Sequence, residues 1–128
     1  MAKARILIAE DEPDLREVLR LQLEMEGFEV IQAPDLRTAI RKLEQHAIDV
    51  VLCDVKLPDG HGVEFITTIK KKYPQIEVIL LTAYGNIPDG VQAIRNGAFD
   101  YIVKGDDNNK IIPLLHRAME KVELAKRV

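Results

Sequence analysis

The sequence predicts an α/β fold in which a doubly wound, five-stranded parallel sheet is covered by five helices. Two observations predict it. Short unbroken apolar runs alternate along the chain with segments whose apolar residues recur at helical spacing. Strands of a parallel sheet have this continuous apolar character because helices cover both faces of the sheet. The regular alternation of strand and helix implies right-handed crossovers that place helices on both faces.

Five segments are expected to form the strands. Four of them are continuous apolar runs: Arg5 to Glu10, Val50 to Asp54, Glu77 to Thr82 and Asp100 to Lys104. The remaining segment, Phe28 to Ala33, alternates between apolar and polar residues, which is typical of a less buried strand. It follows the first run in the chain and is therefore expected to be the second strand.

A stripe of apolar residues with helical spacing follows each of these strands. The five stripes are Leu15, Val18, Leu19 and Leu23; Leu36, Ala39, Ile40 and Leu43; Val63, Ile66, Ile69 and Tyr73; Pro88, Val91 and Ile94; and Ile111, Leu115, Ala118, Val122 and Ala125. Asp35 is expected to cap the second helix. Gly27 and Pro74 are expected to end the first and third helices, and the fourth stops near Asn96 and Gly97. Pro113 falls in the first turn of the last helix, where a missing N–H costs little.

Length, charge and cysteine content bound the class of protein. The 128 residues suit a single domain, 1–128. The net charge of −3 does not favour binding to nucleic acid or to an anionic membrane. The single cysteine, Cys53, cannot form a disulfide within the chain. The sequence shows no signal peptide and no apolar segment of about 20 residues. We expect a cytoplasmic protein that binds neither nucleic acid nor membrane directly.

The last helix, about 110–128, carries no stop signal. Its apolar residues are spaced four, three, four and three apart up to the end of the sequence. Two such heptads are weak evidence for a coiled coil. We expect this helix to continue into a linker that leads to output modules outside this chain.

Several charged or polar residues fall where the predicted strands end. Glu10 and Asp11 end the first strand, Asp54 ends the third, Thr82 ends the fourth and Lys104 ends the fifth. Ligands of open parallel sheets bind beyond the carboxyl ends of the strands, so these side chains should lie together. Neighbouring carboxylates repel one another unless they take up protons or hold a cation.

The chemistry of this group points to a metal ion and a phosphoryl group. Oxygen ligands without histidine or cysteine suit a hard ion, Mg²⁺ or Mn²⁺. Lys104 and Thr82 could neutralise and hydrogen-bond a phosphoryl group held beside the ion. Asp54 lies in the middle of the group and can act as a nucleophile, because carboxylates form acyl phosphates.

A structural interpretation of the same residues stays open. The acidic residues after the first strand could simply form the negatively charged first turn of a helix. Lys104 could be a structural ion-pair partner of Asp54. The histidines, His46, His61 and His116, lack ligand spacing and are expected at the surface. Cys53 is expected to fill the core, and Lys70, Lys71 and Lys72 to form a solvated helix end.

Four motifs, in order, resemble the receiver domain of two-component response regulators: ILIAEDEP, VLCDVKLPDGHG, LLTAYG and AFDYIVK. The resemblance covers nearly the whole chain and implies a flavodoxin-like (CheY-like) fold with strand order 2-1-3-4-5. The stretch TAYGNIPDGVQAIRNGAFDYIVK is most similar to receivers of the σ54-activator (NtrC-like) family. In that family an ATPase and a DNA-binding module follow the receiver, which implies an output in transcription.

The resemblance also implies roles for the metal and phosphoryl ligands. A sensor histidine kinase would phosphorylate Asp54. Asp11 would bind Mg²⁺, with Glu10 assisting, and Asp54 and the backbone carbonyl of Lys56 would complete the protein ligands. Such a receiver phosphorylates and dephosphorylates itself and is not an enzyme acting on an external substrate.

Four further residues take part in the switch that the resemblance implies. Thr82 and Lys104 would bind phosphoryl oxygens, and the small Ala83 would leave the site open to the kinase. Tyr101 matches the aromatic residue that turns inward when the threonine moves; as a strand residue on the outer face it needs no such role. Phosphorylation could also drive formation of a homodimer.

Two positions depart from the family pattern. Glu10 stands where the family often has aspartate, and its longer side chain still offers a carboxylate. Gly105 follows Lys104 where the family usually has a proline joined by a cis bond. A cis bond to a residue other than proline costs about 2.5–4 kcal/mol, so we predict a trans Lys104–Gly105 bond and a rearranged loop over Gly105 to Asn109.

Three other functions are compatible with a parallel α/β sheet. A flavin or nucleotide site is disfavoured because the acidic loop after the first strand would repel phosphate without a cation. A phosphate-ester hydrolase is disfavoured because position 56, where a second carboxylate would act, is a lysine. A degenerate receiver that acts only as an interaction module remains the alternative, since Gly105 departs from the family pattern.

Overall fold

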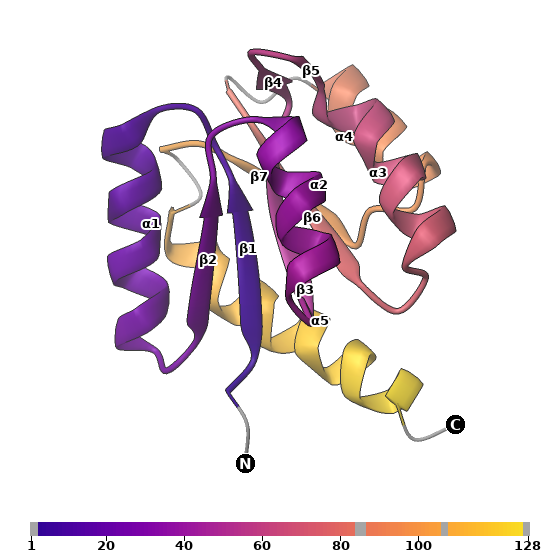
Figure 1. Cartoon of the computed structure of the whole chain (residues 1–128). Coiled ribbons are helices and arrows are strands. Elements are labelled where there is room, and N and C mark those ends of the chain that lie inside the picture. The colour runs from indigo at the N-terminus through magenta and orange to yellow at the C-terminus, as the bar shows by residue number, and fades with distance from the viewer. Residues whose placement is uncertain (1–2, 84–86, 106–107, 127–128) are drawn as a thin grey trace.

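A computed structural model describes residues 3–83, 87–105 and 108–126 of the chain. Five parallel strands form the central sheet in the order β2-β1-β3-β6-β7. These strands are β1 (Arg5–Ala9), β2 (Glu29–Ala33), β3 (Val50–Asp54), β6 (Glu77–Thr82) and β7 (Asp100–Val103). Figure 1 shows their carboxyl ends at the top of the molecule. The predicted parallel α/β sheet is confirmed.

Two short strands that the sequence analysis missed change the strand numbering. β4 (Lys56–Leu57) and β5 (Gly60–His61) pair antiparallel in a small hairpin separate from the main sheet. The predicted order 2-1-3-4-5 is therefore wrong, because the last two positions in the sheet belong to β6 and β7. Two-residue strands show no apolar periodicity, so the sequence pattern of this segment indicates only a turn.

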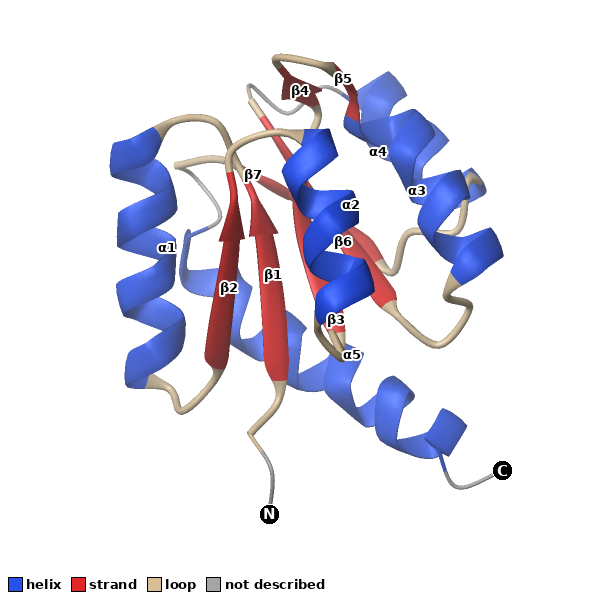
Figure 2. Ribbon diagram, viewed as in Figure 1, coloured by secondary structure: helices blue, strands red, loops and turns tan. Residues whose placement is uncertain are grey.

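Five α-helices in the described residues cover the sheet, as predicted (Figure 2). They are α1 (Pro13–Met25), α2 (Leu36–Gln45), α3 (Gly62–Lys72), α4 (Ile87–Arg95) and α5 (Ile111–Lys126), the last preceded by a 3₁₀ turn at Asn108–Lys110. None of the helices in this described part is long and apolar enough to cross a bilayer.

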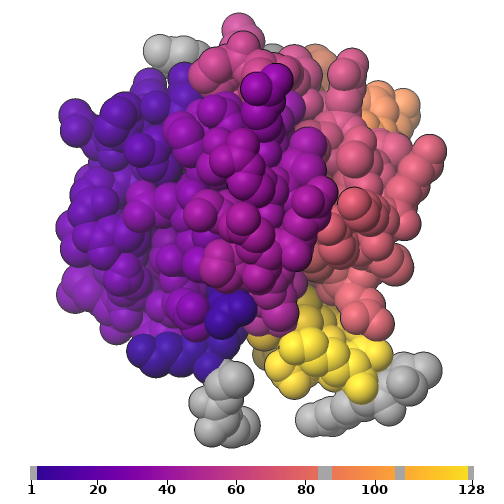
Figure 3. Space-filling view, viewed as in Figure 1, coloured from indigo at the N-terminus to yellow at the C-terminus, as the bar shows by residue number. Residues whose placement is uncertain are grey.

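The core has two layers, one on each face of the sheet. Ile6 and Ile8 of β1 pack with apolar residues of α1 and α5. Leu7 and Ala9 of the same strand face the other way and pack with residues of α2, α3 and α4. In the space-filling view, side chains of the segment that includes α2 and α3 close over the sheet on this second face (Figure 3). Burial on both faces explains the unbroken apolar strands.

Local helix signals were good predictors of where helices begin and end. Asp35 caps α2 by accepting a hydrogen bond of 2.7 Å from the amide of Thr38. Gly27 follows α1 with φ +95°, a conformation that favours glycine. α3 ends at Lys72, two residues before Pro74, and Pro113 lies in the first turn of α5.

The apolar stripe of α4, which was expected to be buried, lies on the exposed face of that helix. Val91 and Ile94 are each 45% exposed, whereas Ala93 is buried. Gly90 lies directly against the ring of Tyr101, where an added Cβ would come within 2.9 Å of three ring atoms. α4 therefore packs through its smallest residues, because only they allow so close an approach.

Single members of three other stripes are also exposed. They are Val18 of α1, Ile40 of α2 and Ala125 of α5. Each lies at the margin of its stripe, where the helix surface turns toward solvent. Apolar spacing identified these helices but not the limits of their buried faces.

Candidate functional site

The predicted site residues gather at the carboxyl edge of the sheet. A hollow of about 570 Å³ opens there, and six of them line it: Asp11, Asp54, Lys56, Thr82, Ala83 and Lys104. The hollow forms because parallel strands end at one edge and their connecting loops diverge to opposite faces. Asp89 of α4 also lines the hollow, and the sequence did not reveal it because Asp89 ends no predicted strand and lies outside the four short motifs.

Three carboxylates converge at this edge. Glu10, Asp11 and Asp54 each offer one oxygen, and the three oxygens lie within 4.8 Å of one another. Glu10 is 0% and Asp54 6% exposed, whereas Asp11 faces solvent. An oxygen-only set with an open side matches the preference of Mg²⁺ for a few carboxylates and several waters. The residues present therefore fit the predicted ion.

Lys104 lies between two of these carboxylates. Its Nζ is 2.7 Å from Glu10 Oε1 and 2.8 Å from Asp54 Oδ2. The residue directly follows β7, and its amide donates a 2.8 Å hydrogen bond to the carbonyl of Thr82. The ammonium thereby offsets part of the negative charge that the sheet edge concentrates.

The replacement of proline by Gly105 leaves Lys104 aimed at the site. The described part of the chain contains no cis peptide, so the Lys104–Gly105 bond is trans, as predicted. Gly105 adopts φ +85°, which is open to glycine at little cost. Asp106 and Asp107, in the loop predicted to rearrange, lie outside the described residues.

Burial and hydrogen bonding shift the pKa values of Glu10 and Lys104. Loss of solvent raises the pKa of Glu10 to about 7; the hydrogen bond from Lys104 lowers this pKa, and the nearby Asp54 raises it. Burial also opposes the charge on Lys104, but hydrogen bonds to Asp54 and Glu10 outweigh it and raise the lysine pKa. The Lys104 side chain is therefore a charged ammonium.

Two hydrogen bonds hold the backbone of Glu10, the residue that follows β1. The amide of Glu10 donates to the carbonyl of Ala33 at 3.0 Å. Its own carbonyl accepts a 2.8 Å hydrogen bond from Nη1 of Arg16 in α1. These contacts hold Glu10 at the edge of the sheet, which a rigid ligand or charge site requires.

Gly62, the first residue of α3 and the one directly after the β4–β5 hairpin, packs on Asp54. The amide of Gly62 donates a 2.7 Å hydrogen bond to the carbonyl of Val55. A Cβ on Gly62 would lie 2.1 Å from the carbonyl oxygen of Asp54, so only glycine fits. Lys56, whose carbonyl is the predicted fourth metal ligand, lies in β4 between these contacts.

Thr82 and Tyr101 lie at different depths. Thr82 is buried, and its hydroxyl donates to the carbonyl of Ala83 at 3.3 Å. Tyr101 is half-buried and packs against the core layer under α4. Its side chain is not among those lining the hollow. The structure thus brings Thr82 to the site and leaves Tyr101 beside it.

The structural expectations hold for Cys53, His61 and His116, but not in full for His46 and Lys70. Cys53 is buried, and burial raises the pKa of its thiol, as expected of a core filler. His61 and His116 are exposed and His46 is half-buried. Lys71 and Lys72 are exposed, but Lys70 is only partly exposed, and its Nζ donates to the carbonyls of Pro74 and Ile76 at 3.0 and 2.9 Å. Charge runs do not reveal such contacts, because they depend on the path of the following loop.

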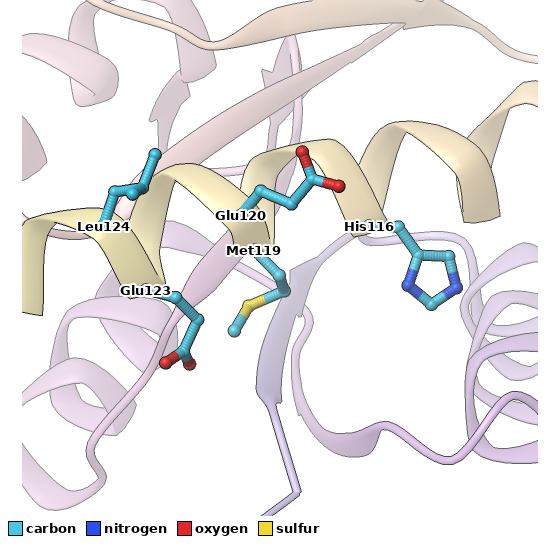
Figure 4. Close-up of a pocket in the computed structure, with 5 residues that line it drawn as sticks. All are labelled: His116, Met119, Glu120, Glu123 and Leu124. Atoms are coloured by element: carbon cyan, nitrogen blue, oxygen red, sulfur yellow. The ribbon is translucent and has the colours of Figure 1, made fainter.

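A second hollow, of about 530 Å³, lies along α5 and away from the acidic group. It is lined by His116, Met119, Glu120, Glu123 and Leu124 (Figure 4). Figure 4 shows these side chains spread along one helix and not converging on a point. None of the predicted site residues lies there.

The chain matches known proteins over most of its length. Residues 6–116 match the response regulator receiver domain family. The response regulator protein PilR of Pseudomonas aeruginosa is 34% identical over 119 residues, which are 93% of this chain and 27% of PilR. The crystal structure of NtrX from Brucella abortus in complex with ADP superposes with a TM-score of 0.91 at 32% identity, covering 98% of this chain and 29% of that one.

A solved structure that holds a receiver domain without further domains is also similar to this chain. The solution structure of the beryllofluoride-activated NtrC4 receiver domain dimer has a TM-score of 0.82 and 33% identity, covering 91% of this chain and 98% of that one. The chain spans about a quarter of the length of the curated relatives that it matches. The resemblance to receivers of NtrC-like σ54 activators is confirmed. The chain belongs to the family of response regulator receiver domains of two-component systems.

Proposed function

We propose that this receiver accepts a phosphoryl group on Asp54 from a histidine kinase and changes conformation to control an output. The observation that carries the proposal is the position of Asp54. Its carboxylate is nearly buried at the end of β3, lies within 4.8 Å of carboxylate oxygens of Glu10 and Asp11, and is 2.8 Å from Lys104 Nζ. A carboxylate held rigidly beside a cation is suited to act as a nucleophile.

In the proposed reaction, an oxygen of Asp54 attacks phosphorus while the bond from phosphorus to the kinase histidine nitrogen breaks. Glu10, Asp11, Asp54 and the Lys56 carbonyl would hold Mg²⁺ or Mn²⁺, which supplies positive charge to the phosphoryl oxygens. Lys104, already beside Asp54, can pair with one of those oxygens, and the hydroxyl of Thr82 can donate to another. Ala83 is exposed and small, which leaves the hollow accessible to the kinase.

The proposed switch runs from Thr82 to Tyr101. Acyl phosphate formation adds charge and acceptor oxygens beside Thr82. A shift of Thr82 toward them would open space into which the ring of Tyr101 can turn. Tyr101 packs against Gly90 of α4, so its movement would reach the surface of that helix. The receiver would act by a population shift between two conformations and not by turnover of an external substrate.

The parent protein is proposed to be a transcription regulator with an ATPase and a DNA-binding module, joined through an extended α5. The curated relatives are about three and a half times as long as this chain, and two of them are named transcriptional regulatory proteins. A homodimer on phosphorylation is proposed by analogy with the activated NtrC4 receiver dimer.

The test is incubation of the purified chain with a small-molecule phosphodonor and Mg²⁺, followed by mass spectrometry. We expect a single phosphoryl adduct on the wild type and none on Asp54→Asn. Asp14→Asn is the matched control, because Asp14 is exposed on α1. An adduct that persists in Asp54→Asn would defeat the proposal.

A second candidate is a degenerate receiver that acts only as an interaction module. Gly105, with its φ of +85° in place of the family's proline, favours it. In that case the wild type would form no phosphoryl adduct in the same experiment. It would still bind its partner proteins.

A further inference from the structure

An aspartate in the β4–β5 hairpin caps a helix that lies 23 positions earlier in the sequence. Asp59 Oδ1 accepts a 2.8 Å hydrogen bond from the amide of Leu36, and its Oδ2 accepts one of 2.9 Å from the amide of Arg37. Both amides belong to the first turn of α2. Figure 1 shows the hairpin at the top of the molecule, near the upper end of that helix. The carboxylate also matches the positive pole of the helix.

Asp59 completes the hydrogen bonding of this helix end. The first amides of a helix have no partner within it. In α2, Asp35 satisfies the amide of Thr38 through its side chain and that of Ala39 through its carbonyl. In the described part of the chain, the carboxylate of Asp59 satisfies the amides of Leu36 and Arg37. The start of α2 is therefore capped by Asp35, which directly precedes the helix, and by Asp59 of the hairpin.

The hairpin needs such a tie because it is very small. Its two strands have two residues each, and an isolated hairpin of that size is not stable in water. Its tip is pressed on α2, since a Cβ on Gly60 would lie 2.5 Å from Leu36 Cδ1. Its base is held at Gly62, the first residue of α3, which lies against the carbonyl oxygen of Asp54. Lys56 lies between the two attachments.

We propose that Asp59 is a positioning residue that holds the Lys56 carbonyl in place for metal binding, by anchoring the hairpin to the start of α2. This inference rests on the proposed function, in which that carbonyl is a ligand of Mg²⁺. Without Asp59 the tip of the hairpin is released while its base stays on Asp54. The carbonyl then samples positions that do not reach the ion, so that affinity for the ion falls and the chemistry at Asp54 is unchanged.

The test compares Asp59→Ala with Asp35→Ala. Each variant removes a cap of the same helix, but only the first releases the hairpin. We expect Asp59→Ala to weaken Mg²⁺ binding by about tenfold, the lower range for residues that orient metal ligands, in calorimetric titration. Asp35→Ala should leave this affinity unchanged although it also lowers the unfolding temperature. Asp59→Asn keeps one acceptor oxygen and should fall between Asp59→Ala and the wild type.

A second readout separates positioning from general damage. The phosphorylation rate of Asp59→Ala with a small-molecule phosphodonor should be low at limiting Mg²⁺ and return to the wild-type rate at saturating Mg²⁺. Circular dichroism and thermal unfolding establish that each variant is folded; if Asp59→Ala is not, Asp59→Asn carries the comparison.

Equal Mg²⁺ affinity in the two capping variants, with a wild type that binds Mg²⁺ and is phosphorylated, overturns the role of Asp59 alone. A wild type that binds no Mg²⁺ overturns the proposed function and the role of Asp59 with it.

Discussion

Three side chains in contact, Glu10, Asp54 and Lys104, carry the charge balance of the site. At this largely buried edge of the sheet, the ammonium nitrogen of Lys104 lies within 2.8 Å of one carboxylate oxygen of Glu10 and one of Asp54. Burial makes each charge costly, and the arrangement is tolerated because the charges offset one another. The excess of negative charge is what a divalent cation would neutralise.

At this scale we predict that Glu10 makes the metal-free protein less stable as pH rises. Its folded pKa, about 7, lies above the ordinary value of 4.5, so the folded state holds the proton more tightly than the unfolded chain. The resulting stabilisation is complete below pH 4.5 and is lost as the pH rises through 7. Urea unfolding with a chelator at pH 5 and pH 8 measures it.

Glu10→Gln is the control for this prediction, because glutamine keeps the size of the side chain without the titration. The decrease in unfolding free energy between the two pH values should be smaller in the variant than in the wild type. The same decrease in both proteins would contradict the assignment of this titration to Glu10.

At the scale of elements, α3 and the loop that follows it are joined by Lys70. Its ammonium binds the carbonyls of Pro74 and Ile76 and lies 3.4 Å from the buried carboxylate of Glu77. Its stem also lies under the turn at Gly97, where a Cβ would meet Lys70 Cγ at 3.1 Å. One side chain thus fixes the start of β6 and the turn before β7.

We predict that Lys70→Met destabilises the fold by about 2 kcal/mol, since hydrogen bonds to a charged group are among the stronger ones. Lys71→Met, one position along on the exposed side, should change the unfolding free energy by less than about 0.5 kcal/mol. Urea unfolding of both variants checks the difference. Equal changes in unfolding free energy would mean that the contacts of Lys70 with its three acceptors stabilise the fold no more than an exposed lysine does.

At the scale of the whole molecule, the site is built from the ends of β1, β3, β6 and β7 and so depends on the intact sheet. A ligand that bridges these ends binds the folded chain and not the unfolded one. Such a ligand stabilises the protein by an amount set by its concentration relative to its dissociation constant.

We therefore predict that Mg²⁺ raises the unfolding temperature, with a gain of about 2.7 kcal/mol at 100 times the dissociation constant. Asp11→Asn should lose most of this gain, because Asp11 supplies the exposed carboxylate of the three. NaCl at equal ionic strength is the control for screening. Thermal unfolding that responds alike to both salts would count against a specific ion site.

The sequence alone determined the alternation of strand and helix, and with it the meeting of Glu10, Asp54, Thr82 and Lys104 at one edge. This was possible because apolar periodicity is local and because parallel strands must end on the same side. The cap at Asp35 and the core position of Cys53 were predictable for the same reason: both depend on their immediate neighbours in the chain.

Only the tertiary structure decided which face of α4 is buried, that Lys56 and His61 belong to a hairpin, and that Asp59 caps α2. Each depends on an approach between segments far apart in sequence. Gly90 is buried because Tyr101 lies against it, and Asp59 caps a helix because the hairpin folds over Leu36. Periodicity records the average environment of a segment, whereas a contact between two particular atoms is fixed only when distant elements pack.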